Sequence, residues 1–229
     1  MVRQRWQRRI DLPYAALNLR YNPFGELTRG QRLETAVPRC DLDSILEFLV
    51  PERRAVQFMG PAGSGKSTHL FCLADGLPKF CYVHLPEAKK REVPAREDLM
   101  IDEAQRLRRR PRMRLWRSAR RIVLGTHVDL DRSLTSCGFS VRTIRLDQQP
   151  TATWLQQTVN QKLMVARRTE APLASMNDAT AVKLLREFGN NVRAIDRYLY
   201  ERFQQFEERA ADGQSLDMQA LFTDEIASS

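Results

Sequence analysis

Short apolar runs alternate with polar or helical stretches through roughly the first 150 residues of the chain. The run at residues 55–59 is too brief for a helix and ends at Gly60, which predicts a buried strand. Four later runs share this character, at residues 80–85, 99–101, 122–124 and 141–146. Strands that alternate with crossover segments favour a parallel sheet covered by helices. We therefore predict an α/β fold with a five-stranded parallel sheet.

Helical periodicity precedes and follows the predicted sheet. Thr28 is placed to cap one short helix, and Asp41 to cap a second that ends at Pro51. Beyond Pro150 the apolar residues recur at helical spacing in three segments, which are marked by Leu155, Val159, Leu163 and Ala166, by Val182, Leu185 and Phe188, and by Val192, Ile195, Leu199, Phe203 and Phe206. This pattern predicts a small, all-helical C-terminal domain.

The charge is distributed unevenly along the chain. The 37 lysines and arginines outnumber the 28 acidic residues, which gives a net charge of +9. Residues 106–121 hold nine arginines and no acid, whereas residues 200–229 hold seven acids and two arginines. A local anionic partner is the natural expectation for such a polarised molecule.

These patterns divide the chain into three parts. We expect residues 1–20 to form a basic tail, residues 21–149 an α/β core, and residues 150–229 a helical domain that ends in an acidic tail. No apolar stretch follows the first arginines to act as a secretory signal. A solvated tail is therefore favoured, and an arginine-rich organelle-targeting segment is the alternative.

The composition is that of an ordinary soluble protein. With 229 residues, of which 42% are hydrophobic, the chain is neither a peptide nor a disulfide mini-protein. Its apolar runs fall far short of the roughly 18 residues that span a bilayer, so we expect no membrane span. The four cysteines have no paired C-x-x-C spacing and the three histidines form no zinc-like cluster. Both observations favour a cytoplasmic protein with reduced thiols.

A glycine-rich turn directly follows the first predicted strand and precedes an amphipathic segment. It fits G-x-x-x-x-G-K-[ST] at every fixed position and continues into Thr68; its residues are Gly60, Pro61, Ala62, Gly63, Ser64, Gly65, Lys66 and Ser67. Glycines let the backbone turn its N–H groups toward phosphate oxygens, and the next helix presents its positive end to the same anion. We predict a nucleotide site in which Lys66 reaches the β- and γ-phosphates and Ser67 ligates Mg²⁺. A chance glycine-rich turn is the weaker alternative.

Two adjacent acids end a later apolar strand. Asp102 and Glu103 lie at the sheet edge where open α/β folds bind their ligands. Asp102 would hold Mg²⁺ through water, and Glu103 would polarise the water that attacks the γ-phosphate. Acids also favour helix N-termini, so a plain helix cap is the alternative. The complete phosphate loop upstream favours the catalytic interpretation.

Together these motifs resemble those of AAA+ ATPases. The resemblance covers about residues 21–206 and rests on the phosphate loop, on Ile101-Asp102-Glu103-Ala104-Gln105, on a strand with a polar end, and on Gly189-Asn190-Asn191-Val192-Arg193. Within that superfamily the chain is most similar to the branch of origin-recognition, transposition-helper and secretion-type ATPases. The resemblance implies a three-layer αβα P-loop core with a helical lid, and ATP and Mg²⁺ as ligands.

The resemblance also implies roles for single residues. It assigns nucleotide and Mg²⁺ to the two motifs, through Lys66, Ser67, Asp102 and Glu103. Arg193 corresponds to the lid arginine called sensor 2, and Asn22-Pro23-Phe24 is similar to a segment that packs near the adenine. Thr126 and His127 end the fourth predicted strand, where the family places a polar sensor of the γ-phosphate. Thr126 is nearer the usual position, and a purely structural role for His127 stays open.

Two departures from the family pattern stand out. Only thirteen residues separate Leu85 from Leu99, which is near the lower limit for a parallel crossover, so the helix usually found there is short or missing. The family's intersubunit arginine finger belongs before the fifth strand, where Ser136-Cys137-Gly138-Phe139 contains no arginine. Arg132 and Arg142 are the available substitutes, and an active ring is in doubt.

The arginine-rich segment has two interpretations. A nucleic acid or another polyanion would be attracted to it, with Trp116 available to stack on bases; the candidate residues are Arg108, Arg109, Arg110, Arg112, Arg114, Trp116 and Arg117. Alternatively, a helix packs Leu107, Trp116 and Ala119 on the sheet and turns its arginines to solvent, or to the acidic C-terminus of this chain or a neighbour. A wholly cationic face favours the polyanion.

The sequence therefore predicts an ATP-hydrolysing molecular switch that acts on DNA or on a protein assembly associated with DNA. It would bind ATP or ADP with Mg²⁺, and a protein partner or a homo-oligomer is possible. A scaffold that binds ATP with little turnover is the first alternative. A small-molecule kinase is less favoured, because Glu103 suits the activation of water.

Overall fold

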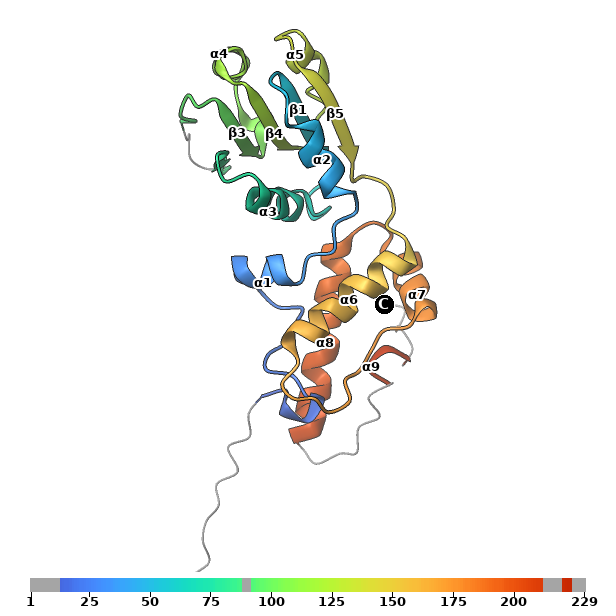
Figure 1. Ribbon diagram of the computed structural model, residues 1–229. Coiled ribbons are helices and arrows are strands. Elements are labelled where there is room, and N and C mark those ends of the chain that lie inside the picture. Colours follow the sequence, from blue (N-terminus) through green and yellow to red (C-terminus); the bar gives the residue numbers. More distant parts are fainter. Residues whose placement is uncertain (1–12, 88–91, 212–219, 224–229) are drawn as a thin grey trace, which may run out of the picture.

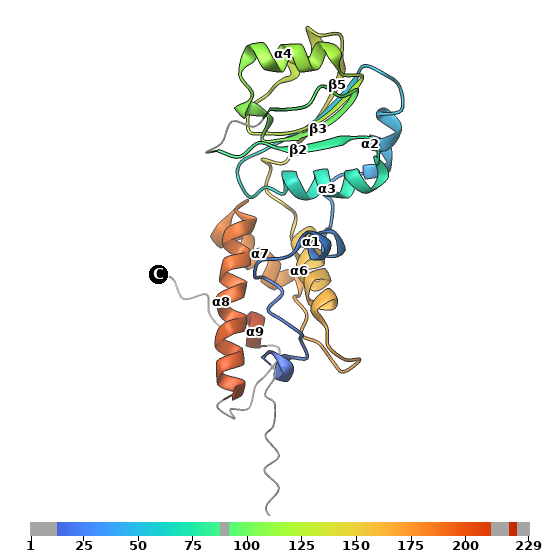
Figure 2. The same ribbon diagram turned by 90° about the vertical axis from the view of Figure 1, so that its left-hand side faces the viewer.

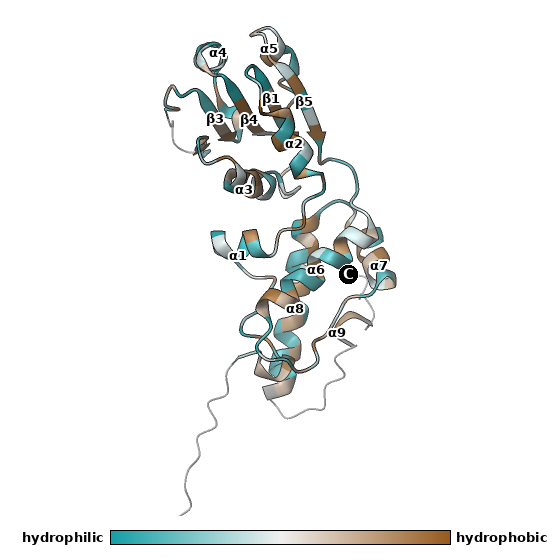
Figure 3. Ribbon diagram, viewed as in Figure 1, coloured by the Kyte–Doolittle hydropathy of each residue, from teal (hydrophilic) through white to brown (hydrophobic). Residues whose placement is uncertain are grey.

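The computed structural model describes residues 13–87, 92–211 and 220–223. They form two lobes, with an α/β lobe drawn above a helical lobe in Figure 1. Hydrophobic residues, brown in Figure 3, occur in both lobes, and each lobe buries apolar residues of its own. Within the described residues no helix is both long and apolar enough to cross a membrane.

The sheet of the α/β lobe contains five parallel strands, as predicted, and the strand order is β2-β3-β4-β1-β5. The strands are β1 (Arg54–Met59), β2 (Cys81–His84), β3 (Asp98–Asp102), β4 (Arg121–Thr126) and β5 (Ser140–Arg145). The register pairs Met59 with Thr126 and Asp102 with Gly125. The carboxyl ends of β1, β3 and β4 therefore lie side by side at one edge of the sheet.

Helices cover both faces of this sheet (Figures 1 and 2). α2 (Leu42–Phe48) and α3 (Lys66–Gly76) pack on one face, and α4 (Arg109–Ser118) and α5 (Asp131–Thr135) pack on the other. Ala55 of β1 joins the apolar cluster on one face and Val56 and Phe58 join the cluster on the other, because successive side chains of a strand point to opposite faces. The result is the three-layer αβα arrangement of the predicted fold.

Local sequence signals set the shorter elements. Thr28 caps α1 (Arg29–Glu34) through a capping box with Gln31, and Asp41 caps α2, as predicted. A 3-10 turn, η2 (Ala104–Arg106), joins β3 to α4. The connection from β2 to β3 contains no helix in its described part, as its short length implied.

The helical lobe combines the C-terminal helices with part of the N-terminal segment. Its helices are α6 (Ala152–Ala166), α7 (Asp178–Phe188), α8 (Val192–Ala211) and α9 (Ala220–Thr223). Leu17, at the end of the 3-10 turn η1 (Ala15–Leu17), is buried with Leu19 and Phe24 in the same apolar cluster as these helices. We predicted a basic tail over residues 1–20, but residues 13–20 belong to this lobe because their leucines are buried there. Four of the five arginines of that prediction, Arg3, Arg5, Arg8 and Arg9, lie outside the described residues.

The chain passes between the lobes in two segments, residues 35–41 and 146–151 (Figure 1). Arg39 ties the two segments together. Its guanidinium donates to the carbonyl oxygens of Leu146, at 3.2 Å, and Gln148, at 2.7 Å. We refer to these two segments as the hinge.

Candidate nucleotide site

The predicted phosphate loop connects β1 to α3. Gly63 and Gly65 have φ angles of 81° and 92°, in the left-handed region that glycine adopts without strain. A Cβ atom added to Gly60 would lie 2.7 Å from the Ser64 hydroxyl and 3.2 Å from Leu146. The backbone of this turn therefore requires glycine at the positions that the motif specifies.

Polar groups of the loop fit a phosphate. The Ser64 hydroxyl is buried and has no hydrogen-bond partner within the described residues. The Lys66 ammonium donates to the carbonyl oxygens of Gly60, at 2.9 Å, and Pro61, at 2.8 Å, and burial lowers its pKa. Thr68 follows in the first turn of α3. An anion in the loop would give the Ser64 hydroxyl an acceptor and would compensate the charge of Lys66.

The Asp102 carboxylate faces the phosphate loop from the end of β3. It is 1% exposed, and its Oδ2 atom accepts a hydrogen bond of 2.7 Å from the Ser67 hydroxyl. Tyr82 and His84, on β2, approach the same oxygen at 3.3 Å, and burial together with Asp102 raises the pKa of Tyr82. A Cβ atom on Gly125 would lie 2.6 Å from Oδ1, so glycine is needed beside the carboxylate. The oxygens of Ser67 and Asp102 are ligands of the kind that Mg²⁺ prefers. The contact between these two residues also shows that the two predicted motifs lie together.

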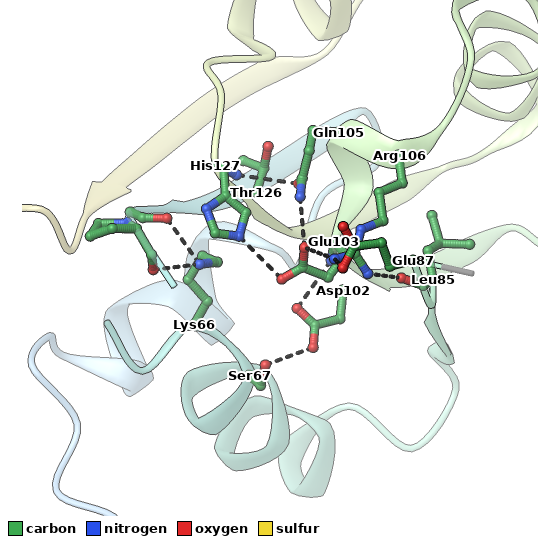
Figure 4. A network of polar contacts seen from close by, with 12 residues as sticks. Lys66, Ser67, Leu85, Glu87, Asp102, Glu103, Gln105, Arg106, Thr126 and His127 are labelled. Carbon is green, nitrogen blue, oxygen red and sulfur yellow. Dashed lines mark hydrogen bonds and ion pairs between the residues drawn. The ribbon is translucent and has the colours of Figure 1, made fainter. Parts of the chain in front are cut away.

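Glu103 has a left-handed backbone, with a φ angle of 63°. Figure 4 shows both of its carboxylate oxygens in contact with neighbours. Oε1 lies 3.3 Å from Nε2 of His127, and Oε2 lies 2.7 Å from Nε2 of Gln105 and 3.3 Å from the Arg106 guanidinium. Burial by itself would raise the pKa of Glu103, but the hydrogen bond from Gln105 and the charges of His127 and Arg106 lower it below its ordinary value. The carboxylate is therefore ionised, as a general base must be.

The two candidate sensors differ in their surroundings. Thr126 is fully buried, and its hydroxyl donates to the Val128 carbonyl and accepts from the Val128 amide. His127 instead faces Glu103, and its main-chain N–H donates to Oε1 of Gln105 at 3.3 Å. Gln105 thus joins Glu103 to the end of β4 (Figure 4).

Arg193 lies beside the phosphate loop, although it belongs to α8 of the helical lobe. A Cβ atom on Gly63 would be 3.3 Å from Cβ of Arg193, and Arg193 is close enough to lower the pKa of Lys66. The Asn190 side chain donates to the Asp147 carbonyl in the hinge. These contacts bring the predicted lid arginine next to the predicted phosphate site.

The Asn22-Pro23-Phe24 segment packs on α8. The Asn22 amide donates to the Tyr200 carbonyl at 3.0 Å, and the rings of Phe24 and Phe203 have centroids 5.1 Å apart. The segment is therefore held by the helical lobe.

Trp116 contradicts part of the polyanion prediction. Its side chain is 0% exposed and belongs to the apolar cluster between α4 and the sheet. The Arg112 guanidinium lies over its ring, 5.2 Å from the centroid. Trp116 is thus unable to stack on a base, because the helix packs it inward, which was the alternative that the sequence left open.

Apart from Arg112, which lies over the Trp116 ring, the arginines of residues 106–121 form two groups. Three of them have acidic partners from other segments: Arg106 pairs with Glu103 and Glu87, Arg120 with Glu52 and Glu97, and Arg121 with Asp98. Five others are exposed and form no ion pair among the residues described; they are Arg108, Arg109, Arg110, Arg114 and Arg117. We call these five the α4 arginines.

The two candidate replacements for an arginine finger also differ. Arg142 donates to the carbonyl and hydroxyl oxygens of Ser44 on α2, so it is engaged within its own lobe. Arg132 is exposed on α5 and has no ion pair in the described part of the chain. Of the two, Arg132 is the more exposed.

Several residues of the site were not predicted from the sequence. Tyr82, His84 and Gly125 were overlooked because only the strand order brings them to Asp102. Gln105 was noted as part of a motif and Arg106 as part of a charge run, without a contact for either. The alternation of polar and apolar residues in Tyr82-Val83-His84 was the available signal for a strand with one polar face.

The strands, the helices and the glycine-rich loop define a three-layer α/β fold of the P-loop class with an attached helical lobe. The chain is similar to Thermotoga maritima RuvB, described as a Holliday junction branch migration motor, with 15% identity and a TM-score of 0.51 over 81% of this chain and 67% of that one. Two variants of that RuvB match at 18% identity and a TM-score of 0.51, covering 79% and 86% of this chain and 63% and 67% of theirs. The chain thus spans about two thirds of RuvB, and the likeness concerns the fold alone. No family model and no curated protein matches the chain.

Proposed function

We propose that this protein is a Mg²⁺-dependent, ATP-hydrolysing molecular switch of the AAA+ type. The observation that carries the proposal is the contact of Ser67 with Asp102 across the phosphate loop, with the ionised Glu103 next in the chain. A phosphate-binding turn, a buried carboxylate and a base converge at one edge of the sheet. Phosphoanhydride hydrolysis needs this combination.

The proposal gives each residue a task. The loop amides and Lys66 bind the phosphates, and Ser67 and Asp102 would hold Mg²⁺, which when bound neutralises developing phosphate charge. Glu103 accepts a proton from the attacking water. Arg193 reports the γ-phosphate to the helical lobe, and Thr126 or His127 acts as the sensor on the core. ATP and ADP would then favour different positions of the lobe.

We further propose that the switch acts on DNA or on a protein assembly bound to DNA. The α4 arginines support this, since these five exposed guanidinium groups form no ion pair with any described residue and such groups attract phosphates. The similarity of the fold to a Holliday junction motor is consistent with a DNA-associated task. We include in this proposal a kinship with the origin-recognition and transposition-helper branch of AAA+ ATPases. We also include a cytoplasmic location, with which the four free thiols are consistent.

A nucleotide-dependent scaffold with little turnover is the second candidate. The observation in its favour is that both Glu103 oxygens already have partners in Gln105, Arg106 and His127, and these partners compete with an attacking water. Arg142, one of the two arginines near an expected finger position, is also engaged internally. A scaffold of this kind would bind ATP tightly and release it unchanged.

Steady-state phosphate release, measured with and without Mg²⁺ and with and without duplex DNA, tests the proposal. We expect Mg²⁺-dependent turnover that rises with DNA and protein concentration, and its loss in Ser67→Ala. Replacement of Ser118, an exposed serine on α4, by alanine is the matched control. Binding of Mg²⁺-ATP in calorimetry without any phosphate release would favour the scaffold. Indifference to Mg²⁺-ATP in both assays would exclude both candidates.

A further inference from the structure

His69 is a buried histidine behind the phosphate loop that the proposed chemistry does not use. It lies on α3, is 3% exposed, and packs on Phe58 with ring centroids 5.2 Å apart. Its Nδ1 atom lies 2.9 Å from the Gly65 carbonyl, and its Nε2 atom lies 3.0 Å from the main-chain nitrogen of Arg39. A main-chain N–H only donates, so Nε2 must accept and Nδ1 must carry the proton. The two contacts therefore fix a single neutral tautomer.

The Gly65 carbonyl determines the direction of the next amide. This carbonyl oxygen accepts one hydrogen bond from the His69 main-chain N–H, at 3.1 Å, and a second from the His69 imidazole. Two hydrogen bonds therefore fix the orientation of this peptide group. In a trans peptide the C=O and N–H groups point in opposite directions. Fixing the Gly65 carbonyl toward α3 therefore directs the Lys66 N–H toward the loop, where a phosphate would be bound.

The other contact of His69 leads to the hinge. The Arg39 amide binds Nε2, and the Arg39 guanidinium donates to Leu146 and Gln148 in the second hinge segment. The same guanidinium lies 5.6 Å from the ring centroid of Trp154 on α6, and the Trp154 indole donates to the Val37 carbonyl at 2.8 Å. One continuous set of contacts thus joins the phosphate loop to both hinge segments and to the helical lobe.

We propose that His69 is a positioning residue that couples the phosphate loop to the hinge. Through the Gly65 carbonyl it orients the Lys66 amide, and through the Arg39 amide it ties that orientation to the segments that join the lobes. Phosphate binding and the placement of the helical lobe then stabilise each other. This inference rests on the proposed nucleotide site and adds the route by which the lobe would respond.

Three variants of the full chain separate the two contacts. In His69→Asn the amide takes the place of Nδ1 and keeps the donor to Gly65 but lacks an acceptor for Arg39. His69→Phe keeps the ring shape and loses both contacts. Arg39→Ala keeps the main-chain donor and loses the contacts to the second hinge segment. Cys72→Ala, on the same helix, is the matched control.

The readouts are calorimetric affinity for Mg²⁺-ADP and hydrogen exchange of residues 35–41 and 146–151 with and without that nucleotide. We expect His69→Phe to weaken binding about three- to tenfold, the size typical of one lost hydrogen bond. His69→Asn should bind within about twofold of the unaltered chain but lose the nucleotide-induced protection of residues 35–41. Arg39→Ala should lose the protection of residues 146–151 only.

Equal affinity of His69→Phe and the unaltered chain would overturn the positioning role, as would equal weakening in His69→Asn and His69→Phe. A fall in thermal stability without either change would show a merely structural histidine and overturn the inference. Should His69→Phe fail to fold, His69→Asn and Arg39→Ala decide by the same criteria. If the unaltered chain does not bind Mg²⁺-ADP, the proposed function itself fails; binding without the expected variant effects removes only the role of His69.

Discussion

The phosphate loop and the arginine-rich segment were both conspicuous in the sequence, yet only the loop has the structure that its pattern predicted. The shape of the loop is a main-chain property, which its glycine spacing specifies. The arginines act through long side chains, whose partners come from Glu52, Glu87 and other distant acids. Local pattern therefore predicts a backbone site better than it predicts a charged surface.

Glu103→Gln should have the largest effect. Loss of the base is expected to lower the rate of phosphate release by about 100- to 10,000-fold, because general-base catalysis contributes on that scale. Nucleotide binding should persist, since the loop does not include Glu103. Single-turnover hydrolysis and calorimetry measure the two quantities. Glu47→Gln, which replaces an exposed glutamate on α2, is the matched control and should leave both quantities unchanged. Unchanged turnover in Glu103→Gln would show that Glu103 is not the general base.

Lys66→Ala tests the loop itself and should come second. An ammonium that binds phosphate contributes charged hydrogen bonds, so Mg²⁺-ATP affinity should fall by about 10- to 150-fold. Lys79→Ala, an exposed lysine after α3, is the control. Calorimetric titration at fixed Mg²⁺ gives the affinities. Equal affinities of the two variants would contradict a phosphate site in this loop.

A triple replacement of Arg108, Arg109 and Arg110 by glutamine tests the α4 arginines. We expect duplex DNA to bind more weakly, and the slope of log affinity against log salt to decrease by about 2.7, because each phosphate contact contributes about 0.9. The measurement is fluorescence anisotropy over a range of salt concentrations.

The charge-matched control for that triple variant replaces Lys183, Arg186 and Arg197 of the helical lobe by glutamine. It lowers the net charge equally but leaves α4 intact, so a specific α4 surface predicts a small change. Equal slopes in the two triple variants would show that the attraction comes from net charge alone.

Trp116→Phe should have the smallest effect on binding. The indole is buried and its Nε1 atom has no partner among the described residues, so no contact to DNA or hydrogen bond is lost. DNA affinity should not change, and the free energy of unfolding should fall by about 1–2 kcal/mol from the smaller ring. Chemical denaturation and anisotropy provide the two measurements. A selective loss of DNA affinity would restore the stacking role that the burial excludes.

Most of the fold was predictable because each strand is a short apolar run bounded by turns. Strand bounds shifted where polar residues continue the pairing, as Asp98 and Asp102 do at the two ends of β3. The N-terminal boundary was wrong, because the arginines of residues 1–9 dominated the pattern and obscured Leu17 and Leu19. Leu17 and Leu19 belong to no periodic apolar pattern, so the sequence does not indicate that they are buried in the helical lobe.

The site was predictable only as far as motifs define it. The loop and the pair Asp102 and Glu103 come from contiguous sequence, and their proximity follows from strand order in a parallel sheet. His69, Tyr82 and Gly125 carry no such signal, since their partners lie on other elements. Their contacts depend on register and on helix placement, which no local pattern contains.

The left-handed backbone of Glu103 has a consequence for protein engineering. Asparagine and glycine adopt this conformation at lower cost than glutamate, so either residue would relieve the chain of about 1 kcal/mol of strain. Libraries selected only for heat resistance would therefore tend to discard the proposed base, and their most durable members would be catalytically inert.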